Sequence, residues 1–142
     1  MKTNEKKEVV PVITEEQALA ELEKGKSRAQ VIIENALLLE EFIKQNEDEA
    51  EKIIEKGKKL TEKFKVFLSL VKDFAKKRYD KIPVKSLVAI VSALLYFVIG
   101  KDLIPDYIPG VGKIDDALIL SVCFKLVKKD VEDYLEWKQT EK

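Results

Sequence analysis

Histidine is absent from this chain of 142 residues, and cysteine, tryptophan and methionine each occur only once. The missing histidine removes the commonest general base and the commonest zinc or copper ligand. Catalytic triads that contain histidine, cysteine–histidine pairs and histidine-based metal sites are therefore excluded within these residues. A single cysteine also excludes an intramolecular disulfide and fits a reducing compartment. Any chemistry would have to rest on carboxylates, lysines, tyrosines or a bound ion.

Net charge is absent as well, because 26 basic residues balance 26 acidic ones. Nothing global therefore indicates nucleic acid as a partner. The charges are unevenly distributed along the chain, however. Residues 34–55 hold eight acidic and two basic side chains, whereas residues 56–81 hold ten basic and three acidic. This pattern would pair two antiparallel helices, present a basic face to an anionic membrane surface, or simply form a solvated helix face, which is the commonest case.

The first 13 residues have no helical period, and we predict that they form a mobile arm. They are charged and lack the apolar core of a signal sequence, which favours a cytoplasmic protein. Residues 14–138 are predicted to form a single all-α domain, a compact bundle of five or six helices. Thr14 and Gln17 form a capping-box pattern at its start, and Gly25 would end the first helix in the left-handed conformation.

Between Ala29 and Phe74, apolar residues recur at alternating steps of three and four, which is typical of helices with one buried face. One long coiled-coil helix would fit this pattern, with Asn46 as a polar residue that fixes the register. We favour two or three antiparallel helices, broken near residues 45–48 or at Gly57, because glycine inside a helix costs about 1 kcal/mol.

The segment from Pro83 to about Ile99 is apolar nearly all round, as expected of a helix in a protein core or in lipid. Its apolar run over residues 87–99 would be about 20 Å long, short of a hydrocarbon layer of about 30 Å. We therefore predict a central buried helix over 83–99 and a last helix over 114–138, with Cys123 as a small buried thiol. The residues expected to be heavily buried are Phe64, Phe67, Val71, Ile90, Leu94, Leu120 and Phe124.

Between these two helices, residues 100–116 hold two prolines, three glycines and four aspartates. The prolines stiffen this segment and argue against one regular helix. A stiff polar loop on a helical scaffold is a typical place for a binding function.

This segment resembles the signature of the YkvA-like family. The resemblance rests on Tyr96, on the run Asp102-Leu103-Ile104-Pro105-Asp106-Tyr107-Ile108-Pro109, on Gly112 and on Asp115-Asp116. Flanking residues resemble Gram-positive members of the family too: Arg78-Tyr79, Ile82-Pro83, Asp130, Tyr134 and Trp137. The resemblance covers roughly residues 60–138, with the motif region at 96–117. It departs from the family at Ile99-Gly100, where Ser-Pro is usual.

The family has no established activity, so the resemblance implies a candidate surface and no mechanism. That motif surface comprises Tyr96, Pro105, Tyr107, Pro109 and Gly112.

The four aspartates of the motif have two interpretations. If Asp102, Asp106, Asp115 and Asp116 converged, their oxygens would suit Mg²⁺ or Ca²⁺, either as a structural ion or in a metal-dependent hydrolase. Alternatively, the last two cap the following helix and the first two start turns. We favour this second interpretation, because an ion site requires a convergence that spacing alone cannot show.

Three functions therefore stay open. The favoured one is a non-enzymatic interaction or scaffolding domain that binds a protein partner through the Asp/Pro/Gly-rich loop, since the chain shows no recognisable catalytic arrangement. The second is a protein with a divalent-ion site. The third is a peripheral membrane protein that the basic stretch holds at an anionic membrane surface.

Overall fold

The computed structural model describes residues 15–57, 59–103 and 116–140, with the backbone alone for 99–103 and 116–117. Within these residues the chain is all-α and has no strand, which confirms the predicted class. Seven helices are described, one more than the larger predicted number. They are α1 (Glu15–Lys24), α2 (Lys26–Glu34), α3 (Ala36–Glu55), α4 (Glu62–Ala75), α5 (Val84–Leu103), α6 (Asp116–Leu126) and α7 (Lys128–Thr140). The predicted arm, residues 1–13, lies outside the described residues.

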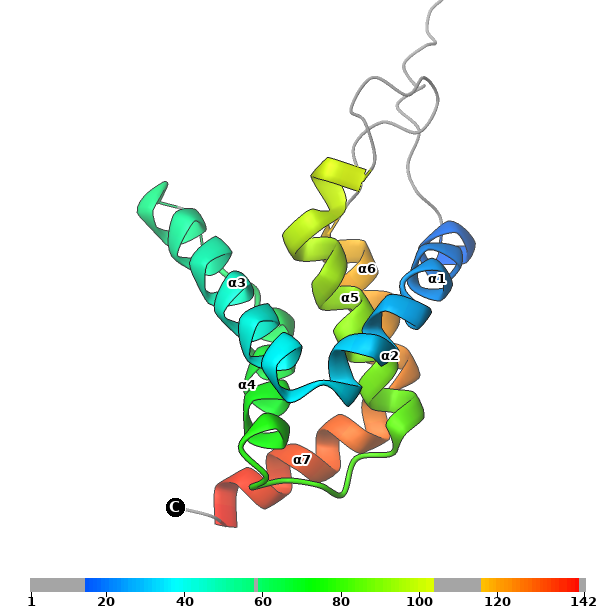
Figure 1. Cartoon of the computed structure of the whole chain (residues 1–142), viewed down its shortest axis with the longest axis vertical. Helices are drawn as coiled ribbons and strands as arrows, with labels where there is room; N and C mark the ends of the chain where they lie inside the picture. The colour runs from blue at the N-terminus through cyan, green and yellow to red at the C-terminus, as the bar shows by residue number, and fades with distance from the viewer. Residues whose placement is uncertain (1–14, 58, 104–115, 141–142) are drawn as a thin grey trace, which may run out of the picture.

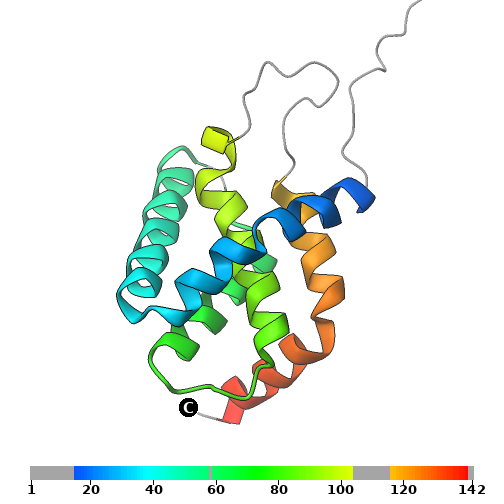
Figure 2. The same ribbon diagram turned by 45° about the vertical axis from the view of Figure 1, so that its right-hand side comes forward.

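Helix α5 is the centre of the bundle, as predicted. It packs against α1, α2, α3, α4 and α6, and Figures 1 and 2 show it between the α1–α2 pair and the α3–α4 hairpin. Each side chain from residue 87 to residue 96 is at most 8% exposed. Burial of so many apolar side chains is the main driving force for folding here, at roughly 25 cal/mol per Å². No helix of the described residues is both long and apolar enough to cross a membrane.

The predicted core is confirmed at six of its seven positions. Phe64, Phe67, Val71, Ile90, Leu94 and Leu120 are buried, and only Phe124 is partly exposed. Cys123 is fully buried, as expected, and burial raises the pKa of its thiol to about 12.

Helices α1 and α2 meet at Gly25, which is right-handed with a φ of −85°, so the predicted left-handed cap is wrong. Glycine is required here because of space. A Cβ at this position would lie 2.4 Å from the Oγ of Ser92 on α5. That Oγ donates a hydrogen bond to the carbonyl oxygen of Leu22 over 2.7 Å, so the close approach joins α1 directly to the central helix.

The 27–80 region divides into α2, α3 and α4, but at partly different places from those predicted. The break at Gly57, with a φ of 80°, is confirmed. The break near residues 45–48 is absent, because α3 continues through a buried Asn46 whose amide donates to the Phe42 carbonyl over 2.9 Å. The other break lies at Asn35, whose Oδ1 accepts from the backbone amides of Leu37 and Leu38 over 3.0 and 3.1 Å. Such an asparagine cap starts a helix efficiently.

The predicted last helix is two helices, α6 and α7, which change direction at Val127. Helix α7 runs across one end of the bundle, opposite the C-terminal end of α5 (Figure 1). Val127, Val131 and Tyr134 are each at most 3% exposed. The change of direction therefore covers the end of the core with apolar side chains.

Candidate functional site

Most of the predicted motif lies outside the described residues. Asp106, Asp115, Pro105, Tyr107, Pro109 and Gly112 all fall within 104–115. Asp102 lies in the last turn of α5 and Asp116 begins α6, with only the backbone described at both. The Mg²⁺ or Ca²⁺ site therefore stays a prediction. Among the residues described, no group of three or more acidic or cysteine side chains is placed to hold a metal ion.

Tyr96 differs from the prediction that placed it on the motif surface. Its ring belongs to the core and is 8% exposed, because α5 is covered on all sides at this level. Its hydroxyl donates to the Glu21 Oε1 over 3.1 Å and so connects α5 with α1. Tyr96 is a packing residue in this structure.

Residues that flank the motif region in the sequence come together at the α7 end of the bundle. Tyr79, which follows α4, packs its ring against Tyr134 and Trp137 of α7, with centroid distances of 5.1 and 4.9 Å. Asp130 at the start of α7 accepts a hydrogen bond from Ser86 of α5. These residues of the resemblance thus form one structural contact region, where aromatic pairs add to the stability from burial.

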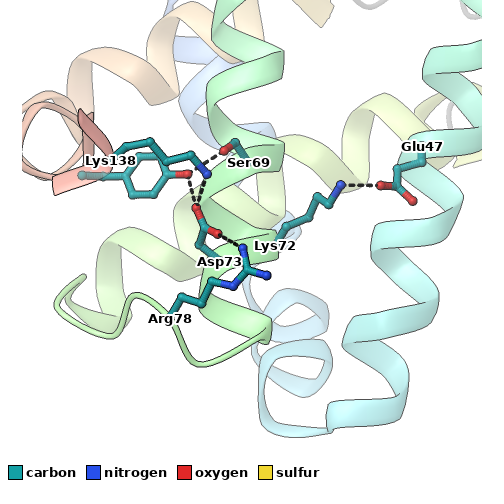
Figure 3. Close-up of polar contacts among 7 residues, drawn as sticks. Glu47, Ser69, Lys72, Asp73, Arg78 and Lys138 are labelled. Carbon is teal, nitrogen blue, oxygen red and sulfur yellow. Dashed lines mark hydrogen bonds and ion pairs between the residues drawn. The ribbon is translucent and has the colours of Figure 1, made fainter. Parts of the chain in front are cut away.

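A buried carboxylate lies at the centre of this region. Asp73 of α4 is only 3% exposed. Its Oδ2 accepts from the Tyr134 hydroxyl over 2.5 Å and from the Lys138 Nζ over 2.7 Å, and its Oδ1 lies 3.7 Å from Arg78 Nη1. The Ser69 hydroxyl lies 2.6 Å from the Tyr134 hydroxyl. Figure 3 shows these contacts, and we call Ser69, Asp73, Arg78, Tyr134 and Lys138 the Asp73 cluster.

Asp73, Tyr134 and Lys138 each have a pKa shifted away from neutrality. The pKa of the Asp73 carboxyl is lowered overall. Burial by itself would raise this pKa, but the hydrogen bonds from Lys138 and Tyr134 and the positive charges of Lys138 and Arg78 together have a larger effect in the opposite direction. Burial and the hydrogen bond to Asp73 raise the pKa of Tyr134. The same carboxylate raises the pKa of Lys138 through its hydrogen bond. A general base works best with a pKa near the operating pH, so this cluster is arranged for stability rather than proton transfer.

A cavity of about 690 Å³ lies beside the Asp73 cluster, between α3 and α4. Its apolar lining comprises Ala50, Ile54, Leu60, Phe64 and Leu68. Its charged lining comprises the cations Lys65, Lys72, Lys76, Arg78 and Lys138 and the carboxylates Glu47, Asp48, Glu51 and Asp73. Lys72 forms an ion pair of 2.7 Å with Glu47 of α3 (Figure 3). This ion pair joins the acidic and basic stretches, as the interpretation of two paired helices expects. We call the cavity the α3–α4 groove.

The segment that joins α4 to α5 is strongly basic. Residues 76–85, the basic connection, contain five basic side chains and one acidic one. All five are exposed: Lys76, Lys77, Arg78, Lys81 and Lys85. Val84 lies between two of these lysines and is 65% exposed.

Lys77 has an unusual backbone conformation within this connection. Its φ is 62°, the left-handed region that side chains other than glycine rarely adopt. The amides of Lys77 and Arg78 donate to the carbonyls of Phe74 and Asp73 over 3.0 and 2.9 Å, which is the Schellman pattern at the end of α4. Glycine is the usual residue at this position.

An apolar corner lies next to the basic connection, where α2 turns into α3. Leu37 is 77% exposed and Val31 is 57% exposed. A cavity of about 470 Å³ adjoins this corner, and its lining includes Ala36 and Leu39 from α3 together with Lys77 and Asp80 from the connection. Glu34 and Glu40 also line this cavity, so carboxylates lie between the corner and the connection. We call Val31, Leu37 and Leu38 the apolar corner.

Sequence reasoning missed Asp73 and the Asn35 corner. Asp73 lies three residues after the buried Leu70 and therefore on the buried face of the same helix. A carboxylate in such a position is almost always paired with a cation, so it could have been recognised as a buried ion pair. Tyr134 and Lys138 are four residues apart and hence share one face of α7. Asn35, immediately before an apolar run, is an N-cap signal that could have located the corner.

Comparison with known proteins gives two matches. Residues 86–122 match a family model described as "Protein of unknown function (DUF1232)". The chain is also 36% identical over 81 residues to the "Uncharacterized membrane protein YkvA" of Bacillus subtilis (strain 168), which covers 57% of this chain and 76% of that protein. No solved structure matches significantly.

Proposed function

Since the chain belongs to the YkvA-like family, of which one relative carries the name of a membrane protein, we propose that it binds peripherally to anionic membrane surfaces. The observation that carries this proposal is the group of five exposed cations in the basic connection, with the exposed Val84 among them. Surfaces that combine lysines with protruding apolar side chains bind at the boundary between lipid headgroups and acyl chains.

The basic connection supplies the electrostatic part of the binding. Its net charge is +4, from five cations and Asp80. A lysine or arginine close to an anionic leaflet contributes about 1 kcal/mol, and this contribution decays within a Debye length of about 8–10 Å. Binding is therefore expected to weaken steeply as the salt concentration rises.

The apolar corner supplies the part of the binding that salt does not screen. Leu37 and Val31 both expose more than half of their surface. Transfer of such side chains out of water is favourable by roughly 25 cal/mol per Å² of apolar surface. The Asn35 cap holds the first turn of α3 in place, so Leu37 is presented on ordered backbone.

The interaction or scaffolding role that we expected for the 100–116 loop involves residues outside the described ranges. It stays a prediction, as does the ion site. Peripheral membrane binding is the function that the described surface supports best, and it makes the favoured location the cytoplasmic face of a membrane.

Co-sedimentation with vesicles tests the proposal. The probes are vesicles of phosphatidylcholine alone and vesicles that also contain phosphatidylglycerol, at low and high salt. We expect binding only to the anionic vesicles. The triple variant Lys77→Gln, Lys81→Gln, Lys85→Gln should bind about 100-fold more weakly, because three contributions of about 1 kcal/mol are lost.

A second triple variant provides a control with the same change in net charge. Lys44→Gln, Lys56→Gln, Lys59→Gln alters three exposed lysines on α3 and just after it. We expect this variant to bind like the wild type. Equal weakening by both triple variants would show a general effect of net charge, and no binding of the wild type at low salt would disprove the proposal.

A further inference from the structure

We infer that the α3–α4 groove binds one membrane phospholipid, with the anionic headgroup at its cationic end and an acyl chain along its apolar end. The groove opens beside the basic connection, and the two share Lys76 and Arg78. The inference takes its ligand from the proposed function, since a bilayer at the connection would bring phospholipids to the groove.

The polarity of the groove changes once along α4. Residues 60, 64, 68, 72 and 76 follow one another at steps of four along α4 and its two ends, so each is a neighbour of the next. The first three of them are leucine or phenylalanine, and the last two are lysine. All five line the groove. A ligand that fits this row of side chains needs an apolar part and an anionic part, in that order.

The apolar end offers a surface for a chain. Ile54, Leu60 and Leu68 line it, and Ile54, near the C-terminal end of α3, is 57% exposed. Phe64 forms part of the lining and packs its ring on Phe97 of α5, with a centroid distance of 4.2 Å. The volume of about 690 Å³ lies within the usual range of about 300–1,000 Å³ for small-molecule sites.

The cationic end offers donors for a phosphate. The side chains of Lys72, Arg78 and Lys138 are 40%, 61% and 47% exposed, although each forms an ion pair with Glu47 or Asp73. Each has further N–H donors than these pairs use. The whole groove is lined by five cations (Lys65, Lys72, Lys76, Arg78 and Lys138) and four carboxylates (Glu47, Asp48, Glu51 and Asp73), so its net charge is +1. The excess of positive charge favours an anionic headgroup.

Titration of the protein with octyl phosphate, followed by calorimetry and NMR, tests the inference without a membrane. Two half-probes each contain one of the two parts of octyl phosphate. Inorganic phosphate has the anion without the chain, and octyl glucoside, used below its critical micelle concentration, has the chain without the anion. We expect saturable binding of one octyl phosphate, with both half-probes at least tenfold weaker. Equal affinity for octyl phosphate and either half-probe would disprove a site for an amphiphile, as would no saturation.

Two single variants locate the site. Lys72→Gln should weaken octyl phosphate binding roughly tenfold, because a charged donor to the phosphate is lost. Glu47→Gln breaks the same ion pair but keeps the lysine, so it should leave affinity unchanged or raise it. Ile54→Ser, at an exposed position, should weaken octyl phosphate but not phosphate. Equal affinities of Lys72→Gln, Ile54→Ser and the wild type for octyl phosphate would place the ligand elsewhere.

The vesicle and octyl phosphate experiments fail separately. Octyl phosphate binding without vesicle binding would keep the groove site and remove the membrane as its source. Vesicle binding without octyl phosphate binding would keep the proposed function and overturn the groove inference.

Discussion

The Asp73 cluster and the basic connection adjoin each other and share Arg78, yet the charge at the centre of the cluster is buried and paired, whereas the charges of the connection are exposed. Within the cluster, a carboxylate is buried and accepts hydrogen bonds from Tyr134 and Lys138. Within the connection, five cations are exposed, and only Arg78 also contacts the Asp73 carboxylate. Lys77 even adopts a left-handed conformation that a glycine would adopt without strain.

This difference separates charges that stabilise the fold from charges that the fold does not need. A buried ion that loses its partners destabilises strongly, whereas an exposed lysine contributes little to stability. The Asp73 cluster attaches α7 to α4 and so covers the end of the core. The connection leaves its cations available to an external anion, which is why we place the membrane surface there.

The largest effect is expected for Asp73→Asn. This change removes the charge that pairs with Lys138 and weakens the hydrogen bond from Tyr134, so we expect a loss of about 2–4 kcal/mol in the free energy of unfolding. Urea denaturation followed by circular dichroism would measure it. Asp80→Asn is the matched control, since Asp80 is exposed in the basic connection. It should change stability by less than about 0.5 kcal/mol.

Comparable losses for Asp73→Asn and Asp80→Asn would contradict the distinction between the two regions. It would mean that the charges of the connection also stabilise the fold.

The stability of the protein should also depend on pH through the Asp73 cluster, with a smaller change than Asp73→Asn causes. Because the folded pKa of Asp73 is lowered from its ordinary 3.8, its contribution is present above that value and lost as the pH falls through the folded pKa. The pKa values of Tyr134 and Lys138 are raised from 10.0 and 10.5, so their contributions are present below those values and lost as the pH rises through the folded pKa. Thermal unfolding across pH should show a plateau with both flanks.

Asp73→Asn should remove its own contribution to the acidic flank and lessen the alkaline flank, because burial continues to raise the pKa of Tyr134 while the hydrogen bond to the Asp73 carboxylate is lost. Asp80→Asn should keep them. Flanks of the same steepness in Asp73→Asn would assign the pH dependence to groups outside the Asp73 cluster.

The sequence predicted most of the fold because burial follows apolar pattern. The continuous apolar run of α5 and the stripe of α4 located the centre of the bundle and six of seven core residues. The errors in the predicted helix boundaries lie where a local cap or turn, and not the apolar pattern, determines where a helix begins or ends. Asn35 starts α3 through two backbone hydrogen bonds, and the turn at Val127 divides α6 from α7, although the apolar spacing passes through both positions without interruption.

The candidate site was less accessible from sequence, since it depends on distant residues. Asp73 and Tyr134 are separated by 61 positions, and Lys72 and Glu47 meet only because α3 and α4 form a hairpin. The opposite charges of residues 34–55 and 56–81 predicted that pairing in outline. The exposure of Leu37 was not predictable from its apolar surroundings, because it follows from the direction in which α3 leaves Asn35.

The smallest effect is expected for Lys77→Gly, and its two consequences have opposite signs. A left-handed residue other than glycine costs about 1 kcal/mol, so this variant should be more stable than the wild type by up to that amount in urea denaturation. It also removes one cation from the connection, so its binding to phosphatidylglycerol vesicles should fall about fivefold. Lys77→Gln separates the two effects: it removes the charge and keeps the strained backbone, so binding should fall equally while stability stays unchanged. Stronger folding together with weaker binding would mean that lysine is retained here for its charge and not for the structure. If Lys77→Gly bound vesicles as well as the wild type, the strained lysine would have no part in membrane binding, and the surface that carries it would have to lie away from the end of α4.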